Sequence, residues 1–131
     1  MEKRILVVDD EAAIRDIMTC VFTRAGYEVQ TAANAEEALA LARQQRYPVF
    51  FLDLSLPGMD GIELCRHMRK DNPCSIAYAV TGYADPGEGM GGEEWGFEDC
   101  FTKPTDLKTL LRAAETAFQK LAHREINEGC V

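Results

Sequence analysis

Two uninterrupted apolar runs, each followed by an aspartate, constrain the fold of this chain more than any other feature. Residues 5–8 read Ile-Leu-Val-Val and precede Asp9, and residues 49–52 read Val-Phe-Phe-Leu and precede Asp53. A short apolar run without a polar break is typical of a strand that is buried on both faces. Such strands belong to parallel sheets covered by helices, so the two runs predict an α/β domain.

Helical patterns separate the predicted strands. Apolar residues at positions 14, 17, 18, 21 and 22 form a stripe on one side of a first helix. Asn34 and Asp60 are each followed three residues later by Glu, a pattern that favours a helix start. A last helix is expected from about Asp106 to about His123, with a leucine-rich stripe on one side.

The remaining strands are expected at residues 28–32, 76–80 and 100–102. Five strands that alternate with helices predict a doubly wound α/β domain with a parallel sheet and helices on both faces. We expect this single domain to span residues 1–123 and to be followed by a frayed tail over residues 124–131. The glycine-rich stretch 85–92 stands where a fourth helix would come, so that helix is expected to be short or disordered.

Charge and cysteine content limit the functions to consider. The net charge of -8 disfavours direct binding of nucleic acid, which needs a basic face, and favours cations and basic partners. No apolar stretch approaches the length of a membrane-spanning helix. The cysteines at positions 20, 65, 74, 100 and 130 are odd in number and scattered, which predicts reduced thiols and a cytoplasmic protein.

Polar residues follow four of the predicted strands: Asp9 with Asp10, then Asp53, Thr81 and Lys103. The carboxyl ends of parallel strands meet at one edge of a sheet, where ligands bind in open α/β folds. Three clustered carboxylates either retain protons or hold a cation, and oxygen ligands suit Mg²⁺ or Mn²⁺.

Each of these residues also has a purely structural interpretation. Asp9 and Asp10 could favour the dipole of the following helix, and Asp53 could cap a turn. Lys103 could be a surface lysine before a proline, and Thr81 an ordinary β-branched residue at a strand end. In the chemical interpretation Asp53 attacks phosphorus and carries an acyl phosphate, while Lys103 contributes positive charge to a phosphate oxygen.

Four motifs in this order resemble the receiver domain of two-component response regulators. They are Ile5-Leu6-Val7-Val8-Asp9-Asp10-Glu11, the run from Phe51 to Gly61 (FLDLSLPGMDG), Val80-Thr81-Gly82, and Thr102-Lys103-Pro104. The resemblance extends over nearly the whole chain. It implies a flavodoxin-like fold with strand order 2-1-3-4-5.

The resemblance also implies roles for individual residues. Asp53 matches the acceptor of a phosphoryl group. Asp10 matches a direct Mg²⁺ ligand, Asp9 its partner acting through water, and Ser55 the residue whose backbone carbonyl completes the metal site. Thr81 and Lys103 match the residues that bind the new phosphate.

By the same resemblance the phosphoryl donor is a sensor histidine kinase or a histidine phosphotransfer protein. The face formed by residues 85–123 would then change its affinity for a downstream protein target, and a homodimer is a further option. Such a domain catalyses its own phosphorylation and turns over no metabolite, so we expect a signalling switch and not an enzyme.

The chain departs from the family pattern near its output face. Position 100 is Cys, where the family has an aromatic residue three positions before the lysine. We therefore hypothesise that signalling runs through ordering of residues 85–95, with Trp95 or Phe97 supplying an aromatic contact. Tyr83 is expected to shield the phosphoryl group from water.

Two other functions compete with the phosphorylated switch. A small Mg²⁺-dependent phosphohydrolase with Asp53 as nucleophile would need a second acid, but Ser55 stands where an aspartate would serve. A degenerate receiver that binds a partner without phosphorylation is disfavoured by the intact acids, Thr81 and Lys103.

Overall fold

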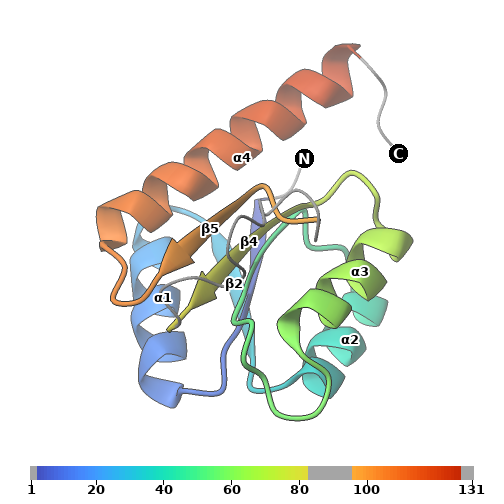
Figure 1. Ribbon diagram of the computed structural model, residues 1–131. Coiled ribbons are helices and arrows are strands. Elements are labelled where there is room, and N and C mark those ends of the chain that lie inside the picture. The colour runs from blue at the N-terminus through green and yellow to red at the C-terminus, as the bar shows by residue number, and fades with distance from the viewer. Residues whose placement is uncertain (1–2, 83–95, 128–131) are drawn as a thin grey trace.

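Five parallel strands form one sheet in the computed structural model, which describes residues 3–82 and 96–127. The strands are β1 (Arg4–Val8), β2 (Glu28–Ala32), β3 (Val49–Leu52), β4 (Ile76–Thr81) and β5 (Asp99–Thr102). Their order is β2-β1-β3-β4-β5, and every neighbouring pair is parallel (Figure 1). The predicted fold class and strand order are confirmed.

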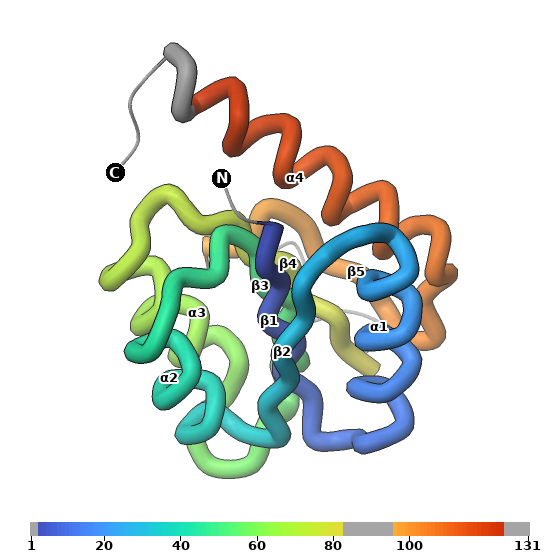
Figure 2. Tube along the Cα trace, turned by 180° about the vertical axis from the view of Figure 1, so that it is seen from behind, coloured from blue at the N-terminus to red at the C-terminus, as the bar shows by residue number. Residues whose placement is uncertain are grey.

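Two pairs of helices cover the sheet. The described residues form α1 (Ala12–Arg24), α2 (Ala35–Gln44), α3 (Gly61–Asp71) and α4 (Leu107–Asn127). Helices α1 and α4 lie on one face, and α2 and α3 lie on the other (Figures 1 and 2). This arrangement confirms the doubly wound architecture with helices on both faces.

The central strands are buried because their side chains alternate between two apolar layers. Phe51 in β3 packs with residues of α1 and α4, whereas its neighbours Phe50 and Leu52 pack with residues of α2 and α3. All four residues of β3 are at most 1% exposed. The two-sided burial explains why this strand is an unbroken apolar run.

The predicted helix starts are confirmed by hydrogen bonds. The Asn34 side chain accepts a hydrogen bond from the Glu37 N–H (2.9 Å), and the Glu37 carboxylate accepts one from the Ala33 N–H (3.0 Å). The Asp60 carboxylate accepts a hydrogen bond from the Glu63 N–H at 2.9 Å. These caps satisfy N–H groups that have no partner within a helix.

The last helix is longer than predicted. Helix α4 continues to Asn127, so the expectation of a frayed tail from residue 124 is wrong for residues 124–127. The apolar stripe that was predicted ends at Leu121, but a helix that is already nucleated extends by further residues at little cost. Arg124 in the last turn also suits the negative end of the helix dipole.

Cys74 contradicts the prediction of free thiols throughout. It precedes β4 and is disulfide-bonded, whereas Cys20 and Cys65 are free. Spacing along the sequence does not reveal which cysteines meet in the fold, and for that reason the odd count misled. The disulfide also weakens the cysteine pattern as support for a cytoplasmic location.

Several predictions fall on residues outside the described ranges. These are the glycine-rich stretch 85–92 with its short fourth helix, the hypothesised ordering of residues 85–95 with Trp95, and the role of Tyr83. Within residues 3–82 and 96–127, none of the helices combines the length and the apolar character that spanning a bilayer requires.

Candidate functional site

The strand ladder fixes two acidic residues at the carboxyl edge of the sheet. The Asp9 N–H donates to the Ala32 carbonyl (3.1 Å), and the Asp53 N–H donates to the Val8 carbonyl (2.9 Å). The side chains of Asp9 and Asp53 are buried, with exposures of 2% and 4% for the whole residues. Their backbones are therefore held as rigidly as the strands that they follow.

Asp9, Asp10 and Asp53 form one carboxylate cluster. Each offers an oxygen atom, and these atoms all lie within 4.8 Å of one another. Asp10 is exposed, whereas the other two are buried. The convergence that was predicted from the parallel sheet is thus confirmed for these three residues.

Lys103 carries the positive charge of this cluster. Its Nζ atom lies 2.7 Å from Asp9 Oδ2, 3.3 Å from Glu11 Oε1 and 3.4 Å from Asp53 Oδ2. Its backbone N–H donates to the Thr81 carbonyl at 2.7 Å, and the peptide bond to Pro104 is cis. The lysine that follows β5 is therefore brought to the acids that follow β1 and β3.

Backbone donors orient both buried carboxylates. Asp9 Oδ1 accepts a hydrogen bond from the Glu11 N–H at 2.9 Å, and Asp53 Oδ1 accepts one from the Ser55 N–H at 3.0 Å. In addition, Arg15 Nη1 donates to the Asp9 carbonyl at 2.7 Å. Each carboxylate thus has one fixed oxygen, and its other oxygen faces Lys103.

Burial and charge act in opposite directions on the titration of Asp9 and Lys103. Burial raises the pKa of Asp9, although the hydrogen bonds from Lys103 and from the Glu11 N–H oppose this effect. Burial alone would lower the pKa of Lys103, but its hydrogen bond with Asp9 and the nearby negative charges raise it overall. Lys103 is therefore protonated at neutral pH.

Gly61 permits the close approach of α3 to the acidic loop. Its N–H donates to the Leu54 carbonyl at 3.1 Å. A Cβ atom at this position would collide with the Asp53 carbonyl oxygen and would lie 2.8 Å from the Leu54 Cα. The contacting atoms are backbone and cannot rotate away, so a side chain at residue 61 would displace Asp53.

An apolar groove of about 550 Å³ opens beside the cluster, between α1 and the start of α4. Glu11 and Lys103 line its end at the acidic cluster, and Ile17 and Leu107 line its apolar walls. Ile17 is 46% exposed and Leu107 38% exposed, although both lie on the apolar stripes of their helices. Exposed large side chains that share a groove are typical of a docking surface.

The other predicted site residues are placed as follows. Thr81 is fully buried at the end of β4, and its backbone carbonyl accepts the hydrogen bond from the Lys103 N–H. Ser55 is exposed and contributes its N–H to Asp53. Cys100 is half-buried against the core on the α2–α3 side, and Phe97 is 2% exposed within that core.

Sequence reasoning missed one participant. Glu11 has no predicted role, yet its carboxylate contacts Lys103 and its N–H holds Asp9. Its position directly after the acidic pair was the available signal. Its contact with Lys103 joins residues that are 92 positions apart in the sequence, so no local pattern reveals it.

Comparison with known proteins places these residues in a family context. Residues 5–115 match the response regulator receiver domain. The chain is 36% identical over 125 residues to the transcriptional regulatory protein ResD of Bacillus subtilis, covering 89% of this chain and 52% of ResD. It is also 36% identical over 111 residues to the DNA-binding response regulator MtrA of Mycolicibacterium paratuberculosis, covering 85% of this chain and 49% of MtrA. The chain therefore spans about half the length of these relatives.

Solved structures show the same similarity in three dimensions. A CheY-like receiver domain protein from Methanospirillum hungatei superposes with a TM-score of 0.82 at 34% identity, covering 95% of this chain and 98% of that one. The chemotaxis protein CheY4 of Vibrio cholerae gives 0.81 at 30% identity, covering 89% and 99%. Both similarities extend over nearly the entire domain.

Proposed function

The chain belongs to the response regulator receiver domain family, the phosphoacceptor switch of two-component systems, and we propose that Asp53 is its phosphoacceptor. The observation that carries this proposal is the setting of Asp53, which is buried, oriented by the Ser55 N–H and faced by the Lys103 ammonium at 3.4 Å. In the reaction an Asp53 carboxylate oxygen forms a bond to phosphorus while the phosphorus–nitrogen bond of a phosphohistidine breaks. The released imidazole takes up a proton.

The acidic cluster fits a divalent cation. Asp9, Asp10 and Asp53 provide carboxylate oxygens close enough to share one ion, and the Ser55 backbone carbonyl would complete the set. Hard oxygen ligands of this kind suit Mg²⁺, and Mn²⁺ is an alternative. When bound, the ion supplies positive charge that neutralises the phosphoryl oxygens during transfer.

Thr81 and Lys103 would hold the transferred group. The Lys103 ammonium already lies among the carboxylates and can contact a phosphate oxygen on Asp53 after a small shift. Thr81 ends the adjacent strand β4, and its hydroxyl would donate a hydrogen bond to the same group. Added negative charge on Asp53 would thus reorganise contacts at the ends of β4 and β5.

The donor would be a histidine kinase or a histidine phosphotransfer protein that docks on the apolar groove. A phosphohistidine must reach the carboxyl edge of the sheet, and the groove begins there, at Glu11 and Lys103. Ile17 and Leu107 supply exposed apolar surface for such a partner. Within the described residues no other large hydrophobic side chains are exposed to this extent.

Output is proposed to use the face formed by residues 85–123, which binds a downstream protein or a second copy of the chain. Direct nucleic-acid binding by this domain is not proposed, since the net charge of the chain is -8. MtrA is a DNA-binding response regulator, but this chain covers only 49% of it. A cytoplasmic location stays a prediction.

We propose self-catalysed phosphoryl transfer as the only chemistry of the domain. The competing phosphohydrolase would need a second acid beside Asp53, but Ser55 occupies that position and is exposed. A binding module that is never phosphorylated would not need a lysine beside its buried acids. In this chain Lys103 contacts both Asp9 and Asp53, which favours the phosphorylated switch.

The experiment that tests the proposal is intact mass spectrometry after incubation with acetyl phosphate and Mg²⁺. The parent is expected to gain one phosphoryl group, and the gain should vanish in Asp53→Asn and without a divalent cation. A folded parent that gains nothing would favour the binding module instead. Release of inorganic phosphate from many small phosphate esters would favour the phosphohydrolase.

A further inference from the structure

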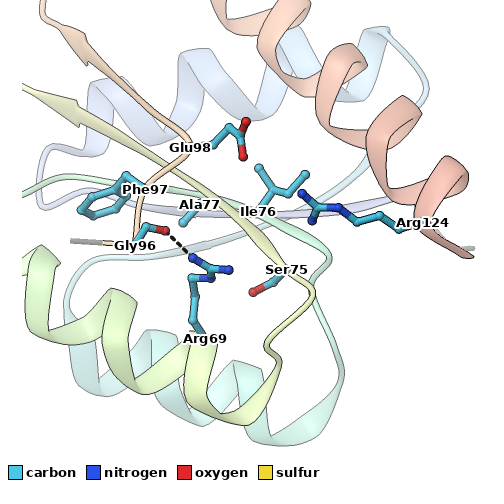
Figure 3. A pocket seen from close by; sticks show the side chains of 8 residues that line it. All are labelled: Arg69, Ser75, Ile76, Ala77, Gly96, Phe97, Glu98 and Arg124. Atoms are coloured by element: carbon cyan, nitrogen blue, oxygen red, sulfur yellow. Dashed lines mark hydrogen bonds between the residues drawn. The ribbon is translucent and has the colours of Figure 1, made fainter. Parts of the chain in front are cut away.

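A polar cavity of about 210 Å³ lies at the edge of the sheet opposite the acidic cluster (Figure 3). Its walls include Ser75 and Ala77 at the start of β4, and Glu98 just before β5. It is therefore at the amino ends of these strands, whereas Asp53 follows the carboxyl end of β3. None of the proposed phosphorylation or metal-binding residues lines the cavity.

Two arginines reach this cavity from different helices. Figure 3 shows Arg69 entering from α3 and Arg124 entering from the last turns of α4. Arg124 makes no hydrogen bond or ion pair with the residues whose side chains the structure describes, 3–82 and 96–124. An arginine at a cavity wall that is not engaged in an ion pair is available to an incoming anion.

The Arg69 guanidinium is only partly satisfied. Its Nη1 atom donates to the Gly96 carbonyl at 2.9 Å, and its Nη2 atom donates to the Pro73 carbonyl at 3.2 Å. Both acceptors are neutral, and no carboxylate of the described residues forms an ion pair with Arg69. Its Nε atom is buried and has no hydrogen-bond partner. A buried donor without a partner is rare in folded proteins and indicates that something else satisfies it.

The local charge is positive in a chain that is acidic overall. Glu98 is the only acidic residue that lines the cavity among the described residues, and its Oε2 atom is paired with Lys120 Nζ at 2.5 Å. Among the described residues the two arginines therefore have no ion-pair partner, although the net charge of the chain is -8. Such a site attracts an anion, whereas most of this protein's surface repels one.

We propose that this cavity binds a small phosphate-class oxyanion between Arg69 and Arg124. The two guanidinium groups approach from different directions, and a tetrahedral oxyanion presents oxygens in several directions at once. The Arg69 Nε–H would gain its missing acceptor, and Arg124 would gain a charged partner. The cavity has room for orthophosphate or for a small phosphate monoester.

The test is a titration of the full chain with orthophosphate at constant ionic strength and without Mg²⁺. Changes in the amide NMR chemical shifts report binding. Saturable shifts are expected at residues 75–77 and 96–98, with none at Lys103. Arg124→Gln should weaken the affinity at least about tenfold, since a charge-assisted pair is lost. Arg66→Gln is the matched control because Arg66 is exposed on α3 and lies outside the cavity.

Three outcomes would overturn the proposal. Shifts that sodium chloride reproduces, or that survive unchanged in Arg124→Gln, would show general screening and no site. Succinate that binds more tightly than orthophosphate would show that the cavity selects dicarboxylates. Arg124→Gln removes no hydrogen bond or ion pair among the residues whose side chains the structure describes (3–82 and 96–124). Its amide NMR spectrum without phosphate shows whether the fold is kept. Phosphorylation of Asp53 by acetyl phosphate, measured in the same variant, keeps this test separate from that of the proposed function.

Discussion

The Lys103 ammonium lies closer to Asp9 than to Asp53, at 2.7 Å against 3.4 Å. The lysine that would later hold the phosphoryl group is therefore engaged first with an acid of the proposed metal site. A divalent cation that binds Asp9 has to compete with this ion pair, so metal binding and the position of Lys103 are coupled.

Removing this lysine should strengthen metal binding. In Lys103→Met the competing positive charge is absent, and we expect Mg²⁺ to bind about tenfold more tightly, because a close like charge costs more than 1 kcal/mol even near a protein surface. Isothermal titration calorimetry measures the affinity. Lys120→Met is the control, since Lys120 pairs with Glu98 on the surface. Weaker or equal binding in Lys103→Met would contradict the coupling.

A methyl group at residue 61 should disturb the phosphoacceptor. Gly61→Ala places a Cβ atom against the Asp53 carbonyl and 2.8 Å from the Leu54 Cα, so the loop must move. We expect a stability loss of about 2 kcal/mol and slower phosphorylation by acetyl phosphate. Gly82→Ala serves as the stability control, because its Cβ would meet no atom within 4 Å. Equal stability and an unchanged phosphorylation rate in Gly61→Ala would refute this role.

Tyr78 should make the fold sensitive to alkaline pH. Burial, together with the charges of Glu98 and Asp99, raises the pKa of its hydroxyl from 10.0 to about 12, and the hydroxyl donates to the Ala113 carbonyl at 3.0 Å. The folded state favours the neutral phenol, so this contribution is complete below pH 10.0 and is lost as the pH rises toward about 12. At about 1.4 kcal/mol for each pKa unit, the loss approaches about 3 kcal/mol.

Tyr78→Phe isolates this effect. The variant should be less stable than the parent by about 1 kcal/mol at neutral pH, because one hydrogen bond is lost. The deficit should shrink or reverse above pH 10.0, where the parent's unfolded state gains an ionised tyrosine. Urea unfolding of both proteins at neutral pH and above pH 10.0 measures this difference in the free energy of unfolding. A deficit that does not depend on pH would show that the hydroxyl titrates normally.

The apolar groove should affect phosphoryl transfer from protein donors but not from small-molecule donors. Ile17→Asn removes an exposed apolar side chain, so stability should change by less than about 1 kcal/mol. Transfer from a phosphorylated histidine kinase should slow at least about tenfold, as expected for an interface residue, whereas acetyl phosphate should react at the parent rate. Thr116→Asn, exposed on α4 outside the groove, is the control. A kinase that transfers equally well to Ile17→Asn does not use the groove.

The fold and the acidic site could both be predicted from the sequence because both depend on where the buried parallel strands end. Strand β3 is buried on both sides, and this requirement produces an apolar run whose end is easy to locate. Parallel strands then bring Asp9, Asp53 and Lys103 to the same edge without any knowledge of side-chain contacts. The resemblance to receiver domains supplied the strand order and the individual roles.

Other features depend on contacts that periodicity does not encode. A helical stripe shows which side of α1 carries Ile17, but not that the neighbouring element leaves it 46% exposed. Glu11 contacts Lys103 across 92 positions of sequence, and the disulfide at Cys74 likewise depends on proximity in space. The cavity between Arg69 and Arg124 joins two helices that are distant in the sequence.

The measurement that tests the central claim most directly is the identification of the phosphorylated residue. Borohydride reduces an aspartyl phosphate to homoserine, and peptide mass spectrometry then locates the reduced residue. After reaction with acetyl phosphate and Mg²⁺, the account predicts homoserine at position 53 and at no other position. Homoserine at Asp9 or Asp10, or its absence from a folded and phosphorylated chain, would contradict the assignment of Asp53 as phosphoacceptor.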